Sequence, residues 1–372
     1  MAVVFGLLCA CSFTPGTLYP IDSGSGSDGR MDMMNNIMVD MMIDTPTNTL
    51  CYGPPSGAFR ICLASAPTTP FSVSGGFVNY NTTQCNGGVM VTPTGGPELC
   101  VIAATSINID SQLNVSGSRP LVLLSTMSVS ISGSITVAAG ADPTLCNAST
   151  PGGAAQSGAS GGGGGSFGTR GGNGGSGDGG NGAAGAAGLV ATQPVAVLRG
   201  GCSGAAGGTQ STIGDAGNAG LAGGALYILG STIAISSNID ASGRGGGGGP
   251  TQNGGGGGGG SGGMIALYAT TIAVSGRVVA NGGAGGEGAD TNDVGSTGLS
   301  PNPFTPTIVA TCPNGPSSGG IGGSGAAGTS SATAGASSGD GGGGGGGGHG
   351  VIRILSGQTQ AMTGGTFSPT PN

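Results

Sequence analysis

Few residues of this sequence could do acid–base chemistry on a substrate, because charged residues make up only 6% of the chain. Asp110 and Asp240 fall in strand-like stretches, and Arg244 and Arg277 follow the second of them. Enzymes that cleave polysaccharides need two carboxylates, or a carboxylate with a base, on one face. A carbohydrate-active β-helix enzyme, a polysaccharide lyase or hydrolase, is therefore an alternative. A surface ion pair between Asp240 and Arg277 is the simpler interpretation.

Other chemistries lack the residues that they need. The one histidine, His349, follows the continuous glycines 341–348, which is a poor context for a Ser-His-Asp triad. The sequence has no lysine and so no Walker A phosphate loop. A net charge of −7 without a basic patch argues against nucleic acid as a partner. We therefore expect no catalytic residue, no cofactor and no metal.

Most of the cysteines are spaced as a disulfide framework would be. The spacings are too wide for a zinc site. The pairs that the sequence suggests are Cys51–Cys62, Cys85–Cys100 and Cys146–Cys202. The last pair flanks the first glycine-rich block and would fix both of its ends, and Cys312 is left over. The sequence alone does not derive the pairing, but disulfides would place the protein in an oxidising, exported compartment.

The first 11 residues, MAVVFGLLCAC, resemble a bacterial lipoprotein signal peptide. Their apolar run is shorter than the about 20 residues that span a bilayer. Leu8-Cys9-Ala10-Cys11 is similar to a lipobox, and this resemblance implies that Cys11 carries a lipid anchor. An ordinary secretory signal is the alternative. We expect residues 1–11 to direct export and the lipid to make the membrane a partner.

Residues 12–50 have the composition of a tether. Ser, Gly and Asp come first, followed by the methionine-rich run MDMMNNIMVDMMI. Thioether side chains bind copper, but no Cys or His lies among these methionines to complete a copper site. A low-complexity tether between membrane and folded body is the preferred interpretation.

Five stretches between the glycines share one pattern. They begin at Leu99, Pro120, Gly224, Gly263 and Gly350. Each has four or five apolar residues, a Ser/Thr step, an alternating run such as Ile-Ala-Val-Ser-Gly and a short third run, and these are strand signals. A unit of about 20 residues with up to three short strands is typical of one coil of a β-solenoid.

We therefore expect an all-β fold in which residues 99–372 form a β-solenoid, similar to a parallel β-helix, of about five short coils. Stacked coils would share one apolar core, because a single coil cannot bury its apolar face. Residues 51–98 would form a Cys-bearing N-terminal cap. An antiparallel β-sandwich is the alternative, since the spacing of units does not separate parallel from antiparallel pairing.

Most of the 90 glycines gather in three blocks at about 152–223, 243–263 and 282–350. All three leave at the same place in the repeat, which predicts long insertions on one face. Residues 171–188, GGNGGSGDGGNGAAGAAG, place glycine at nearly every third position, as in an extended helix with three residues per turn. This period is lost at 341–348. We expect flexible loops, with packed polyglycine helices as the alternative for part of the first block.

The repeat GGNGGSGDGGNG resembles PGRS-type bacterial surface proteins. A closer similarity is to uncharacterised glycine-rich cell-surface lipoproteins of myxobacteria and their relatives. Those combine a lipobox, an acidic tether, a Cys-bearing segment like ELCVI (98–102) and repeats like GGALYILGSTIAISSNIDASGRGGGGG. The resemblance implies a location in the cell envelope and no known activity.

These features together predict a non-enzymatic, lipid-anchored envelope protein at the outer membrane or cell surface, with a structural, adhesive or matrix role. Ser, Thr and Asn on its outer faces would bind glycans weakly, or other envelope proteins. The enzyme described above is the alternative. A third hypothesis is an ice-binding surface built from polyglycine helices.

Overall fold

The computed structural model describes residues 49–138, 140, 146, 149–153, 158–210, 216–355, 360–361 and 364–372. Within these ranges the chain forms strands, extended segments and turns, with one short 3-10 turn, η2 (Asp178–Gly180), and no α-helix. The fold is all-β, as the sequence predicts. The expected lipidation site Cys11 and nearly all of the expected tether lie outside the described residues.

The strands follow the repeats of the sequence. The N-terminal strands are β1 (Leu50–Tyr52), β2 (Ile61–Leu63), β3 (Phe71–Val73), β4 (Phe77–Asn81) and β5 (Val89–Val91). The five repeats then supply three strands each: β6 (Leu99–Ala104), β7 (Ile107–Ile109), β8 (Gln112–Ser116); β9 (Leu121–Ser125), β10 (Ser128–Ile131), β11 (Ile135–Val137); β12 (Ala225–Leu229), β13 (Thr232–Ile235), β14 (Asn238–Asp240); β15 (Met264–Tyr268), β16 (Thr271–Val274), β17 (Arg277–Val279); β18 (Val351–Ile354), β19 (Gln360–Ala361) and β20 (Thr366–Ser368).

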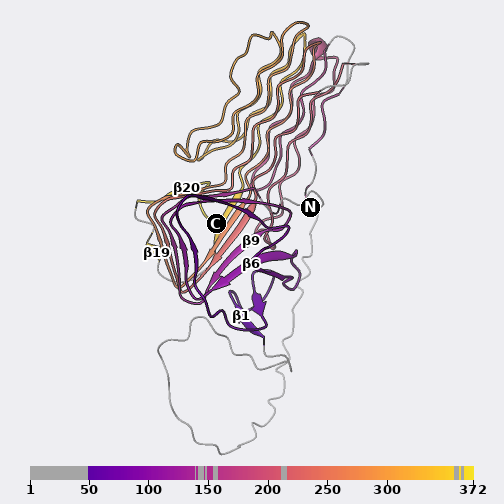
Figure 1. Cartoon of the computed structure of the whole chain (residues 1–372). Coiled ribbons are helices and arrows are strands. Elements are labelled where there is room, and N and C mark those ends of the chain that lie inside the picture. Colours follow the sequence, from indigo (N-terminus) through magenta and orange to yellow (C-terminus); the bar gives the residue numbers. More distant parts are fainter. Residues whose placement is uncertain are drawn as a thin grey trace, which may run out of the picture. The chain divides into compact units, whose positions relative to one another are not determined.

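Each repeat gives one strand to each of three six-stranded sheets (Figure 1). Sheet 1 has the order β19-β16-β13-β10-β7-β3, sheet 2 the order β20-β17-β14-β11-β8-β4, and sheet 3 the order β18-β15-β12-β9-β6-β5. Strands of successive repeats pair in parallel. Among the named strands of the described chain, only the β1–β2 hairpin and the β5–β6 pair are antiparallel. The segment expected as a cap thus supplies β3, β4 and β5, each at an edge of one sheet.

Aliphatic residues in register hold the sheets together. In sheet 1, Val73, Ile109, Ile131, Ile235 and Val274 stand in one row and are all buried. Equivalent rows in sheets 2 and 3 join the same apolar cluster. Each such side chain contributes about 1.5–3 kcal/mol on burial, so the two-residue alternation of the strands sets the register.

Sheet 3 is buried on its second face as well. The hairpin β1–β2 and residues 189–198 cover it and form a second apolar cluster with its outward side chains. In this cluster the rings of Phe59 and Tyr227 meet edge to face, with centroids 5.5 Å apart. This double burial explains why β12 reads as a continuous apolar run, ALYIL, and not as an alternating one.

All three glycine-rich insertions leave at one corner of the repeat. They follow β11, β14 and β17 of sheet 2 and return to β12, β15 and β18 of sheet 3. Their extended segments pack together as a bundle of chains in Figure 1. We call this bundle the polyglycine array, formed by the described residues of 149–224, 241–263 and 280–350.

Candidate functional site

Three central segments form the interior of the polyglycine array. They are residues 158–168, 253–263 and 340–350, one from each insertion. The three bond to one another in parallel, as in Gly162 N–H to Gly256 O and Gly345 N–H to Gly162 O, both 2.9 Å. Around segment 253–263 the backbone bonds reach segments 158–168, 198–210, 216–224, 241–250, 280–290 and 340–350. Neighbours on all sides therefore take up the polar backbone groups that a buried glycine run must satisfy.

The central segments have three residues per turn. A Cβ placed on Gly255 or Gly258 would point at the segment around Ser160, whereas one on Gly256 or Gly259 would point at residues 283–286. Residues three apart thus face the same neighbour, as in an extended polyglycine helix. A Cβ on Gly258 would lie 2.1 Å from the carbonyl oxygen of Gly163. Only glycine fits where another backbone comes this close.

The expectation of flexible loops is wrong for the described parts of the insertions. Residues 341–348 are continuous glycine and lack the three-residue glycine period. Their backbone groups are nevertheless buried and hydrogen-bonded to several segments. Continuous glycine marks segments surrounded on every side. A period of three marks segments at the rim, where the residue between the glycines faces solvent, as Asn173 does between the buried Gly172 and Gly174.

One carboxylate lies inside the array. Glu287 is fully buried, and its Oε2 accepts the backbone N–H groups of Ser296 at 2.8 Å and Gly315 at 3.0 Å. Next to it lies the free thiol of Cys312, whose pKa is raised chiefly by burial. Charge-assisted bonds of this kind are the strong ones, so Glu287 fastens the neighbouring segments to the array. A search for clustered surface acids would not single it out.

A second set of carboxylates lies on a turn of the array. The Oδ1 of Asp290 accepts the N–H groups of Asn292 and Asp293, and its Oδ2 accepts the N–H of Ser318. The backbone N–H of Asp293 is the largest cause that lowers the pKa of Asp290 to about 2, followed by those of Ser318 and Asn292. The Ser318 hydroxyl also lies 2.9 Å from Asp340. These contacts fix the turn and use up the carboxylate oxygens of Asp290.

The acid and base expected for an enzyme do not come together. Arg277 stands in register with Asn238, and its Nη1 donates to that side chain at 3.3 Å. Asp240 is in register with Thr136 and Val279, so no second carboxylate flanks it in its row of sheet 2. Burial raises the pKa of Asp240, partly offset by bonds from Ser242 and by Arg244. The surface ion pair with Arg277 is absent too, since the only ion pair in the described residues is Arg119–Glu98.

His349 is buried where its segment enters β18. Burial lowers the pKa of its imidazole, and a bond with the backbone of Ser330 opposes this. Its Nδ1 has no hydrogen-bond partner among the described residues. A catalytic histidine needs a carboxylate on one nitrogen and a nucleophile on the other, and the structure gives His349 neither.

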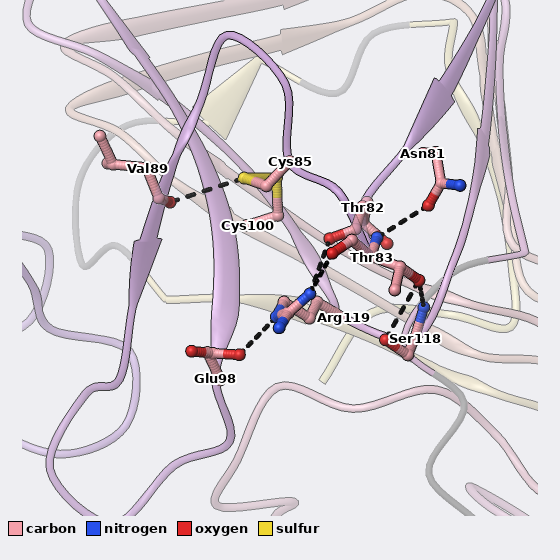
Figure 2. Close-up of polar contacts among 9 residues, drawn as sticks. All are labelled: Asn81, Thr82, Thr83, Cys85, Val89, Glu98, Cys100, Ser118 and Arg119. Carbon is pink, nitrogen blue, oxygen red and sulfur yellow. Dashed lines mark hydrogen bonds and ion pairs between the residues drawn. A yellow bond between two sulfur atoms is a disulfide. The ribbon is translucent and has the colours of Figure 1, made fainter.

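A polar cluster ties the N-terminal strands to the first repeat (Figure 2). The guanidinium of Arg119 bonds to the Glu98 carboxylate at 2.5 Å and to the carbonyl oxygen of Thr83. Thr83 also accepts the N–H of Ser118 at 2.8 Å. The disulfide Cys85–Cys100 closes the same loop (Figure 2), so this cluster has a structural role.

The three disulfides are the pairs that the sequence suggests. They are Cys51–Cys62, Cys85–Cys100 and Cys146–Cys202. Disulfides persist in oxidising compartments and indicate an exported protein. The described part of the chain holds no group of three or more His, Cys, Asp or Glu side chains placed to bind a metal. Nor does it contain an apolar helix of the length that crossing a bilayer requires.

Comparison with known proteins adds no relative. No family model matches the chain, and no curated protein or solved structure matches it either.

Proposed function

We propose that the protein is a non-enzymatic, lipid-anchored component of the cell envelope, at the outer membrane or cell surface. Its body is a β-solenoid. Each of the three insertions is joined to it at both ends, so six chain connections hold the polyglycine array. Cys11 is the lipidation site, and residues 12–50 are the tether. The array is a structural or adhesive surface for glycans or other envelope proteins.

The observation that supports this proposal most is the construction of the array. Its interior admits only glycine at the closest contacts, which makes it a stiff support. Its rim carries small uncharged side chains with exposed hydroxyls, such as Ser331 and Ser337. Such side chains bind sugar hydroxyls by hydrogen bonds and give little affinity singly, so a broad surface acts by many weak contacts.

Metabolic labelling tests the anchor. Cells that express the protein are fed radioactive palmitate, and we expect label in the membrane fraction for the wild type and none for Cys11→Ser. A wild-type protein that is exported without label would exclude the lipid anchor and leave the ordinary secretory signal.

A turnover screen tests the non-enzymatic role. The purified protein is incubated with plant and microbial polysaccharides, and we expect no release of reducing ends or unsaturated products. Turnover that Asp240→Ala abolishes would overturn the proposal in favour of a lyase or hydrolase.

The array favours ice binding as a second candidate function. Exposed residues three apart on one extended segment repeat at about 9 Å, since such a helix rises about 3.1 Å per residue. Ser331, Ala334 and Ser337 follow this spacing. Thermal hysteresis of a solution of the protein would support this function, and freezing at the equilibrium melting point would exclude it.

A further inference from the structure

A small pocket lies between the N-terminal hairpin and the residues that follow β5. Its volume is about 310 Å³, at the lower end of the about 300–1,000 Å³ that ligand pockets occupy. The residues that line it are Ser56, Gly57, Arg60, Cys62, Val91, Thr92, Pro93 and Thr94. This size suits one sugar ring and excludes most cofactors.

The walls of this pocket are held in place. Cys62 is bonded to Cys51. A turn closes where Arg60 N–H donates to Gly57 O at 3.1 Å, and the opposite wall turns where Gly96 N–H donates to Pro93 O at 3.0 Å. The shape therefore exists before a ligand arrives, which lowers the entropy cost of binding.

The lining has one cation and no acid. One guanidinium nitrogen of Arg60, Nη1, donates to Pro55 O at 2.7 Å. A guanidinium has five N–H donors, so this bond orients the group and leaves others to donate. The one described ion pair belongs to Arg119 and Glu98, so no carboxylate among the described residues pairs with Arg60. A guanidinium with spare donors binds carboxylates in bidentate fashion.

The other lining residues fit a sugar. The hydroxyls of Ser56, Thr92 and Thr94 can exchange hydrogen bonds with ring hydroxyls. Val91 and Pro93 supply an apolar wall for the C–H face of a ring. We propose that this pocket binds a uronic acid residue of an acidic glycan, with Arg60 on its carboxylate. This inference rests on the proposed role as an envelope protein that contacts glycans, and it names the class of glycan.

Calorimetric titration tests the site with the full exported chain. The probes are tri-galacturonate, a neutral trisaccharide of galactose, and a tripeptide with a free C-terminal carboxylate. We expect tri-galacturonate to bind, the galactose trimer to bind at least tenfold more weakly, and the peptide not to compete. Binding should weaken as sodium chloride rises from 0.05 to 0.5 M, because exposed ion pairs are screened.

Matched arginine variants locate the binding. Arg60→Gln should lower the affinity for tri-galacturonate at least tenfold. Arg60→Lys should have an affinity between those of wild type and Arg60→Gln, because it keeps the positive charge but loses the paired N–H donors of the guanidinium. Arg170→Gln, an equal charge change on the exposed rim of the array, should leave the affinity within twofold. Thermal unfolding of each variant checks that it folds.

Three results would overturn the inference: equal binding by Arg60→Gln and wild type, equal binding of the neutral trimer, or binding of the peptide in place of the uronate. If palmitate labelling succeeds while these titrations fail, the glycan-binding role of the pocket is rejected and the proposed envelope role stands. If only the labelling fails, the lipid anchor is rejected and the glycan-binding role of the pocket stands.

Discussion

At the scale of single residues, the neighbours of a glycine decide what it does. The glycines of the central segments are required because another backbone passes where a Cβ would stand. Glycine elsewhere, as at Gly339, has open space around that position. Glycines of the same insertions therefore differ in what a substitution costs.

We predict that two glycine-to-alanine changes differ strongly in their effect on the free energy of unfolding. Gly258→Ala places a Cβ 2.1 Å from the carbonyl oxygen of Gly163, and overpacking of this kind costs about 1–3 kcal/mol or more. Gly339→Ala meets nothing within 4 Å and should change the free energy of unfolding by less than about 0.5 kcal/mol. Urea unfolding measures both, and equal stabilities would contradict the close packing.

Glu287 should be the costliest acid to remove from the array. Glu287→Ala leaves the half-buried N–H groups of Ser296 and Gly315 without their acceptor. An unsatisfied buried donor costs about 1–3 kcal/mol, and we expect each of these to cost toward the lower end of that range. Asp293→Ala removes the same charge from an exposed position and serves as the control. The midpoint of urea unfolding should drop for the first variant only; a similar drop in both would assign the effect to net charge.

Asp290 should make stability depend on acid pH. Its pKa of about 2 in the folded chain lies below the about 3.9 of an unfolded aspartate. The carboxylate therefore stabilises the fold above about pH 4, and this contribution is lost as the pH falls toward 2. We expect Asp290→Asn to lower the melting temperature at pH 6 and to approach wild type at pH 2. Thr297→Ala, an exposed change nearby, should keep the wild-type profile. A constant offset at every pH would refute the assignment.

At the scale of elements, strands were predictable and the glycine segments were not. Alternating runs such as Ile233, Ala234 and Ile235 place every second side chain inward, so the sequence carries the strand signal locally. The order of glycine segments depends on contacts between insertions far apart in the chain. Continuous glycine has no period of its own, which is why 341–348 was expected to be loose although it lies at the centre.

The disulfide Cys146–Cys202 should stabilise the first insertion. It spans 56 positions of the chain, and closing a loop of that length contributes about 4 kcal/mol in the chain-entropy model. We expect Cys146→Ser to lower the free energy of unfolding by a large part of this amount under oxidising conditions. Cys312→Ser, which breaks no disulfide, should have a small effect. Wild type with added reductant should lose stability too. A free energy of unfolding of Cys146→Ser equal to that of wild type would show that the disulfide does not stabilise the first insertion.

At the scale of the whole molecule, the three insertions depend on one another. Each supplies one central segment, and each central segment bonds to the other two. The sequence predicts where the insertions leave, because the corners of the repeat are local features, and it suggests candidate cysteine pairs without deriving them. It does not predict the sugar-sized pocket, whose walls come from residues 56–62 and 91–94, or the partners of Glu287. Those depend on how separate segments meet.

Amide hydrogen exchange measured by nuclear magnetic resonance tests the interlocked array most directly. We predict that the glycine N–H groups of 255–262 exchange at least about a hundredfold more slowly than those of the exposed turn at Thr251 and Gln252, because they open only with the array. Exchange of these glycines at the rate of an unfolded chain, while the strands β9 and β12 stay protected, would contradict it.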